Sequence, residues 1–137
     1  MAQLYLLSVV SLVFGGLLAA SGLISRRVPA LAGIADFAEH RSLVLTTGIV
    51  SILVGVLKLF VRAPGDTVPV AGDLLPAIAG IVVGLVLVLG QTSSGETGGG
   101  EAVQQGRQAL LTYRDPIGLA AVLIGILHFL FPAVVLL

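Results

Sequence analysis

The chain contains no cysteine and no tryptophan, and only 10 % of its 137 residues are charged. Without cysteine it can form no disulfide, no thiolate metal site and no cysteine nucleophile. Soluble domains carry roughly 25 % charged residues, because their surface has to be hydrated. The seven basic and seven acidic residues cancel, so the clustered positive field that a nucleic-acid partner requires is also missing.

Hydrophobic residues make up 57 % of the sequence, and the mean hydropathy is +1.13. So little charge cannot cover a water-exposed surface, which indicates that lipid is the solvent for most of the molecule. The length fits a single domain over residues 1–137.

Four hydrophobic stretches are long enough to cross a bilayer, which takes about 20 apolar residues. They cover residues 4–24, 43–60, 74–91 and 117–137. Backbone polar groups in lipid must bond internally, so each stretch is predicted to be a helix. The first has no Lys or Arg before it and exceeds a signal-peptide core in length, so we expect a retained span. The predicted fold is an all-α membrane protein with four transmembrane helices.

The loops between these spans predict the orientation. Short helices at the membrane interface are expected in the first and third loops, with apolar side chains toward lipid: Leu31, Ile34 and Phe37, then Val103, Leu110 and Tyr113. These two loops hold five arginines: Arg26, Arg27, Arg41, Arg107 and Arg114. The second loop has Arg62, with Lys58 just inside the span. The positive-inside rule therefore places loops one and three in the cytoplasm and both termini outside, in the plasma (inner) membrane.

The second and fourth spans resemble each other. Gly48, Ser51, Gly55 and Lys58 match Gly118, Ala121, Gly125 and His128 at an offset of 70. The first and third spans match at an offset of 69, as Ser8, Ser11 and Gly15 do with Ala77, Gly80 and Gly84. This pattern predicts two tandem-duplicated helical hairpins, residues 1–62 and 70–137, related by an axis along the membrane normal. Chance similarity between Gly-, Leu- and Val-rich helices is the alternative.

Small residues recur along one stripe of each span. In lipid, helices associate through close backbone approach, which small residues permit. We expect these stripes to pack within the chain, with self-association as an addition, and assign four glycines to helix packing: Gly15, Gly55, Gly84 and Gly125.

Two ionisable side chains fall inside spans. Lys58, the only lysine, is close enough to the end of its span for its ammonium to reach the membrane interface. The alternative is a functional contact with an anion or a lipid headgroup. His128 lies nine residues before the last residue, about 13 Å along a helix, and is a candidate proton carrier. A neutral histidine bonded to another helix is the alternative. Pro132 cannot donate to the His128 carbonyl, which predicts a polar notch there. The candidate intramembrane polar site is His128, Lys58, Ser51, Thr47 and Ser11.

The first loop holds a second polar group. Asp36, Glu39 and His40 share one face if the segment is helical, a spacing that suits a divalent metal. A hydrated helix face is the simpler interpretation, so we predict no metal and keep this group as a candidate interfacial cluster.

No motif indicates an enzyme. The chain lacks a nucleophile elbow, and the Gly-rich run at 93–100 lacks the lysine of a phosphate-binding loop. We predict no catalytic residue and no cofactor. Two functions remain: a membrane-embedded accessory or assembly partner of a larger membrane protein, or a small channel or transporter, alone or as a homo-oligomer. The bilayer is the expected medium in both.

Overall fold

The computed structural model describes residues 2–60, 71–91 and 100–131, and these segments are helical with no strand. The elements are α1 (Ala2–Ala19), α2 (Ser21–Arg27), η1 (Pro29–Leu31), α3 (Gly33–Glu39), α4 (Arg41–Phe60), α5 (Ala71–Gln91), α6 (Glu101–Thr112) and α7 (Arg114–Leu130). The all-helical prediction is therefore confirmed.

Two helices, at Arg41–Phe60 and Leu74–Gln91, are long and apolar enough by themselves to cross a membrane. The count rises to four if each of two bent pairs forms one span. The pairs are α1 with α2, bent by 73°, and α6 with α7, bent by 64°. Over the predicted first span, residues 4–24, the helix is broken: α1 ends at Ala19 and α2 begins at Ser21.

The bend between α6 and α7 has a local cause. Tyr113 joins the two helices at φ −98° and ψ 17°. Pro116 has no N–H, so the carbonyl four residues earlier, at Thr112, loses its helical partner at that point. α7 begins at Arg114, three residues before the predicted start of the fourth span.

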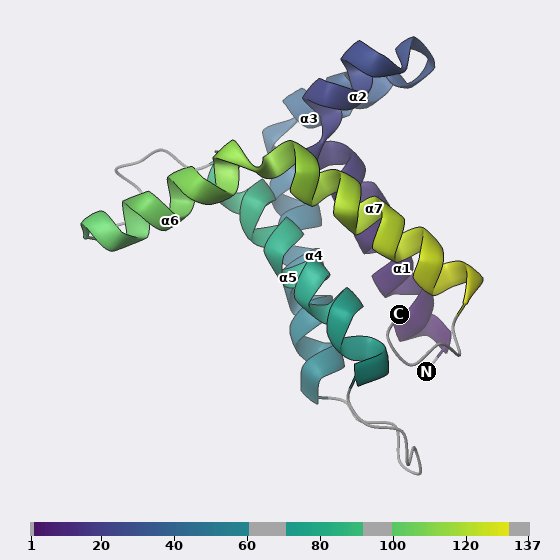
Figure 1. The fold of residues 1–137 in the computed structure, drawn as a ribbon. Helices are drawn as coiled ribbons and strands as arrows, with labels where there is room; N and C mark the ends of the chain where they lie inside the picture. Colours follow the sequence, from purple (N-terminus) through teal and green to yellow (C-terminus); the bar gives the residue numbers. More distant parts are fainter. Residues whose placement is uncertain (1, 61–70, 92–99, 132–137) are drawn as a thin grey trace.

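The long helices form a bundle in which α1 and α5 share the centre (Figure 1). α4 packs along α5 and α7 packs along α1, and each flanking helix also touches the other central helix. The core lies between them and consists of Leu12, Leu18, Ala19, Val44, Val83, Val86, Leu87 and Ala121. These side chains are packed closely between the four long helices.

Glycines set the helix separations. A Cβ atom on Gly84 would lie 2.6 Å from the carbonyl oxygen of Gly48, and one on Gly16 would lie 2.6 Å from that of Gly118. A Cβ on Gly55 would come within 2.7 Å of the Ala77 carbonyl oxygen. Real Cβ atoms do not approach this closely, so a side chain here would push the helices apart.

The four glycines assigned to packing all lie at helix contacts. Gly55 and Gly84 lie between α4 and α5, and Gly125 lies between α7 and α1. Gly15 faces Val83 across the central pair, where an added Cβ would meet Val83 Cγ1 at 3.0 Å.

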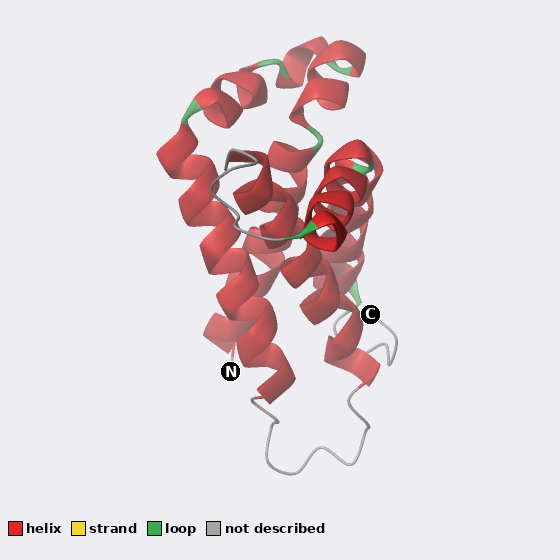
Figure 2. Ribbon diagram, turned by 90° about the vertical axis from the view of Figure 1, so that its left-hand side faces the viewer, coloured by secondary structure: helices red, strands yellow, loops and turns green. Residues whose placement is uncertain are grey.

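The short helices gather at one end of the bundle, where α2, η1 and α3 lie beyond α1 and α6 projects sideways (Figures 1 and 2). Leu31 and Phe37 are exposed as expected for lipid-facing side chains, whereas Ile34 packs against the core. On α6 and the adjoining turn, Val103 and Tyr113 are exposed, and Leu110 packs against the core rather than pointing away from it.

Candidate functional site

Three polar side chains from three helices meet at the end of the bundle opposite α2, α3 and α6. They are Tyr5 of α1, Lys58 of α4 and His128 of α7, and we call them the Tyr–Lys–His cluster. Lys58 Nζ lies 3.3 Å from His128 Nε2. The rings of Tyr5 and His128 are 5.0 Å apart between centroids, and Lys58 Nζ is 5.9 Å from the centre of the Tyr5 ring.

His128 is the most enclosed member of the cluster, with 2 % of its surface exposed. It lies in the last turn of α7, and Lys58 lies in the last turn of α4. The two residues are 70 positions apart, which is the offset at which the second and fourth spans match. The two positions that the sequence comparison aligned are thus in contact across the bundle.

Lys58 is half-buried and directed toward the other two helices. Its ammonium lies near the face of the Tyr5 ring, where the negative quadrupole of an aromatic ring favours a cation. Arg62, the other cation near this end of the sequence span, lies outside the described segments.

Tyr5 lies at the polar notch that was predicted at the His128 carbonyl. Its hydroxyl donates to the His128 carbonyl at 2.6 Å and approaches the Phe129 carbonyl at 3.3 Å. A carbonyl without a partner is costly in lipid, so the phenol replaces the N–H that proline lacks. Pro132 itself lies outside the described residues. Tyr5 was not among the candidate residues predicted from the sequence, although it is the only tyrosine within a predicted span.

The smaller polar candidates do not join the cluster. Thr47 donates its hydroxyl to the Leu43 carbonyl of its own helix at 2.8 Å. Ser11 and Ser51 are 5 % and 1 % exposed, and both lie deeper among the helices. The Ser51 hydroxyl has no hydrogen-bond partner within the described part of the chain, and it would lie 3.3 Å from a Cβ on Gly15. These hydroxyls line helix contacts rather than a continuous polar path.

The interfacial cluster does not assemble into one helical face. Asp36, Glu39 and His40 are all exposed, and α3 ends at Glu39. His40 has extended backbone angles, φ −77° and ψ 98°, so its side chain leaves the helical register. Within residues 2–60, 71–91 and 100–131, no group of three His, Asp or Glu side chains is placed to hold a metal ion.

Two arginines donate hydrogen bonds to backbone carbonyls of other helices, which was not predicted from the sequence. Arg114 Nε donates to the Ala19 carbonyl at 3.0 Å, and Arg107 donates to the Leu89 carbonyl at 3.1 Å. Ala19 ends α1 and Leu89 lies in the last turn of α5, where carbonyls have no helical partner. A cation at a helix C-terminus is also favoured by the helix dipole. These bonds tie the α6–α7 segment to the two central helices.

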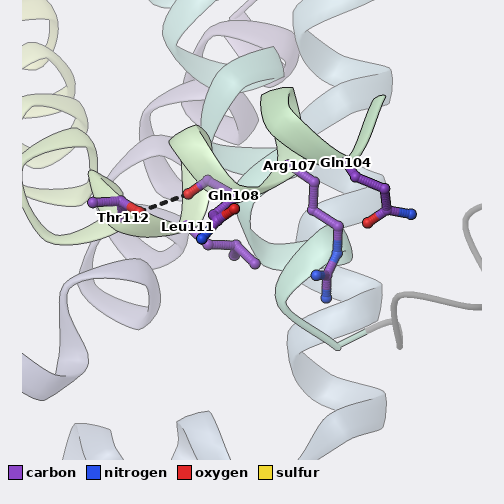
Figure 3. A pocket seen from close by; sticks show the side chains of 5 residues that line it. All are labelled: Gln104, Arg107, Gln108, Leu111 and Thr112. Carbon is purple, nitrogen blue, oxygen red and sulfur yellow. Dashed lines mark hydrogen bonds between the residues drawn. The ribbon is translucent and has the colours of Figure 1, made fainter. Parts of the chain in front are cut away.

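Figure 3 shows a groove on α6, lined by Gln104, Arg107, Gln108, Leu111 and Thr112. Its volume is roughly 490 Å³, and it is open to the surroundings. The Thr112 hydroxyl donates to the Gln108 carbonyl at 2.7 Å. All five residues come from one helix, so the groove gathers no groups from distant parts of the chain.

No curated protein and no solved structure is significantly similar to the chain. A protein-family model does match, over residues 1–128, and it describes a domain of unknown function. The match covers nearly the whole sequence and includes all three residues of the Tyr–Lys–His cluster. The chain therefore belongs to this family of domains of unknown function.

Proposed function

We propose that the protein is a membrane-embedded accessory or assembly partner that acts through helix packing in the bilayer. The observation that carries this proposal is its closed interior. Leu12, Val83 and Leu87 fill the space between the central helices, each with at most 1 % of its surface exposed. Gly15 meets Val83 at the same level. A packed apolar centre leaves no room for a water-filled path through one bundle.

Four spans are part of this proposal. α1 and α7 are apolar and pack along α4 and α5, which are each long enough to cross a membrane. The short segments that complete the bent pairs, α2 and α6, lie at one end of the bundle (Figure 2). They would rest in the headgroup region, where amphipathic helices lie flat.

The exposed surface of the long helices supports the same placement. Leu53 on α4 and Leu123 on α7 are 56 % and 61 % exposed, and Phe60 is 81 % exposed. Large apolar side chains on so much of the outer surface suit lipid or a partner's helices rather than water. The arginines at the α2, α3 and α6 end support a cytoplasmic position for that end, with both termini outside the plasma (inner) membrane.

The glycine contacts support the duplicated-hairpin hypothesis. Gly48 of α4 meets Gly84 of α5, and Gly118 of α7 meets Gly16 of α1. Gly48 and Gly118 are 70 positions apart, whereas Gly16 and Gly84 are 68 apart. The contacts therefore favour an offset of 68 between the first and third spans, in place of the 69 expected from the sequence.

Burial repeats with the same offsets. For each buried residue of α1, the residue 68 positions later in the sequence, in α5, is also buried or half-buried. Each buried residue of α4 falls, 70 positions later, on a buried or half-buried residue of α7. Two similar hairpins packed about a twofold axis would produce this pattern.

Site-specific crosslinking tests the accessory role. Because the chain has no cysteine, single cysteines at Leu53 and Leu123 can each carry a photoactivated crosslinker in native membranes. An accessory protein gives one discrete, reproducible product with a larger membrane protein, from one of the two faces. Crosslinks to lipid alone from both faces, together with solute flux in liposomes of the purified chain, would reject the proposal.

The second candidate is a small transporter, alone or as a homo-oligomer, and the Lys58–His128 contact inside the bundle favours it. Ionisable groups within spans are common in proton-linked transport. In that case His128→Leu should leave expression intact and remove pH-dependent flux in liposomes. Unchanged pH dependence in this variant would rule out His128 as the proton carrier.

A further inference from the structure

Beside a charged Lys58, the 3.3 Å contact requires a neutral His128 imidazole. A lysine ammonium has three donors and no acceptor. At 3.3 Å from Nζ, His128 Nε2 can join a hydrogen bond only by accepting it. The imidazole is then neutral, with its proton on Nδ1. A protonated imidazole has no acceptor and would place a second positive charge beside the ammonium.

The contact also links helices that otherwise stand apart. α4 and α7 lie on opposite sides of the central α1–α5 pair, and neither packs extensively on the other among the described residues. Lys58 reaches across this distance to His128 at the end of the bundle where both helices finish. Each hairpin contributes one partner, so the contact joins α4 to α7 at this end, beside the Tyr5–His128 bond that joins α1 to α7.

The described groups that contact His128 come from α1 and α4. On α1 the Tyr5 hydroxyl donates to the backbone of His128, a bond that imidazole protonation leaves intact. On α5 the third residue is Asp73, at the same end of the bundle, and its side chain lies outside the described part. Lys58 and His128 both take part in further interactions. The other charged residues of these helices lie at the opposite end: Arg41, Arg114 and Asp115.

We infer that the Lys58–His128 contact is a pH-sensitive clasp between the ends of α4 and α7, closed while His128 is neutral and opened when His128 takes up a proton. Histidine is the side chain that ordinarily changes charge between about pH 5 and 8. The half-buried Lys58, at the end of α4, swings toward the interface when the clasp opens. Opening is local, because the glycine contacts of Gly48 and Gly118 lie well along the helices. This inference depends on the contact and not on the accessory role.

Distance measurement across the clasp tests it. Phe60 and Phe131 follow the clasp residues on α4 and α7 and are 81 % and 53 % exposed, so cysteines there accept spin labels without entering the core. The full-length, doubly labelled protein is placed in lipid nanodiscs and measured at about pH 8 and about pH 5. We expect the label distance to shift to longer values at the lower pH and to return on neutralisation.

Three variants identify the group responsible. His128→Gln keeps an acceptor that does not titrate, so the distance shift should be lost. Lys58→Met removes the repelling charge and should abolish the shift independently. His40→Gln changes the only other histidine, which is exposed on the far side of the bundle, and should leave the shift unchanged. Thermal unfolding of each variant at pH 8 checks that it is folded.

The clasp is rejected by any of three results. The first is an unchanged label distance between the two pH values in the parent protein. The second is a shift that persists in His128→Gln. The third is a shift that disappears in Asp73→Asn but not in His128→Gln, which would assign the response to the carboxylate. As a direct check, ¹⁵N spectra of histidine-labelled protein at pH 8 should show one of the two imidazoles as the Nδ1–H tautomer.

Discussion

At the scale of a single residue, the end of α7 depends on the Tyr5 hydroxyl. Pro132 removes the N–H that would bond the His128 carbonyl, and Tyr5 supplies the donor from the other end of the sequence at 2.6 Å. A side chain of α1 thus donates to a carbonyl in the last turn of α7, and this bond helps to set where the two helices meet.

Tyr5→Phe removes this donor and keeps the ring. Leaving a buried carbonyl unsatisfied should destabilise the folded protein by about 1–3 kcal/mol, measured by chemical or thermal unfolding in detergent. Tyr113→Phe is the matched control, because Tyr113 is 62 % exposed and should change stability by less than about 0.5 kcal/mol. Equal stabilities for the two variants would show that the carbonyl finds another donor.

At the His128 carbonyl, one part of the structure could be predicted from the sequence and another could not. The missing N–H follows from the sequence alone, so an unsatisfied carbonyl could be predicted. The identity of its donor could not, because Tyr5 lies 123 positions away and depends on how α1 packs against α7. The same limit applies to Lys58 and His128: each could be singled out by charge within a span, but their contact could not.

At the scale of the helices, glycine determines how closely neighbours approach. Gly55→Ala would place a Cβ 2.7 Å from the Ala77 carbonyl oxygen, a backbone atom that cannot move without shifting α5. We expect destabilisation of about 1–3 kcal/mol in thermal unfolding. Gly106→Ala on α6 meets nothing within 4 Å and should be neutral or stabilising by up to about 1 kcal/mol. If both substitutions were harmless, close packing would not explain the Gly55 position.

Arginine side chains also stabilise helix ends by donating hydrogen bonds to carbonyls there. Arg114→Met removes the donor to the Ala19 carbonyl at the break between α1 and α2, and should lower stability by about 1 kcal/mol or somewhat more. Arg27→Met on α2, where the side chain is exposed, is the control and should have little effect. A smaller loss in Arg114→Met than in Arg27→Met would contradict the capping role.

Hydropathy predicted the existence and approximate limits of α4 and α5, because long apolar runs leave few alternatives in lipid. Hydropathy did not predict the 73° bend after Ala19, because Ser21 and Gly22, a pair typical of helix kinks, do not interrupt the apolar run. Nor did it predict that His40 would leave the register of Asp36 and Glu39, because α3 is only seven residues long. Short elements are decided by packing more than by their own sequence.

At the scale of the whole molecule, the central claim is a four-span bundle with both termini on one side and the α2, α3 and α6 end on the other. The arrangement explains why the arginines collect at one end while the Tyr–Lys–His cluster forms at the other. It also explains why the exposed surface is apolar over the length of α4 and α7.

Cysteine accessibility tests this claim most directly, because the natural chain has no cysteine. Single cysteines replace Gln3 near the start of α1, Arg27 on α2 and Gln105 on α6, all at exposed positions. An impermeant maleimide added to intact cells should label Gln3→Cys at once, and the other two only after the membrane is opened. Labelling of Gln3→Cys and Gln105→Cys from the same side, or recovery of the protein in the aqueous fraction without detergent, would contradict the account.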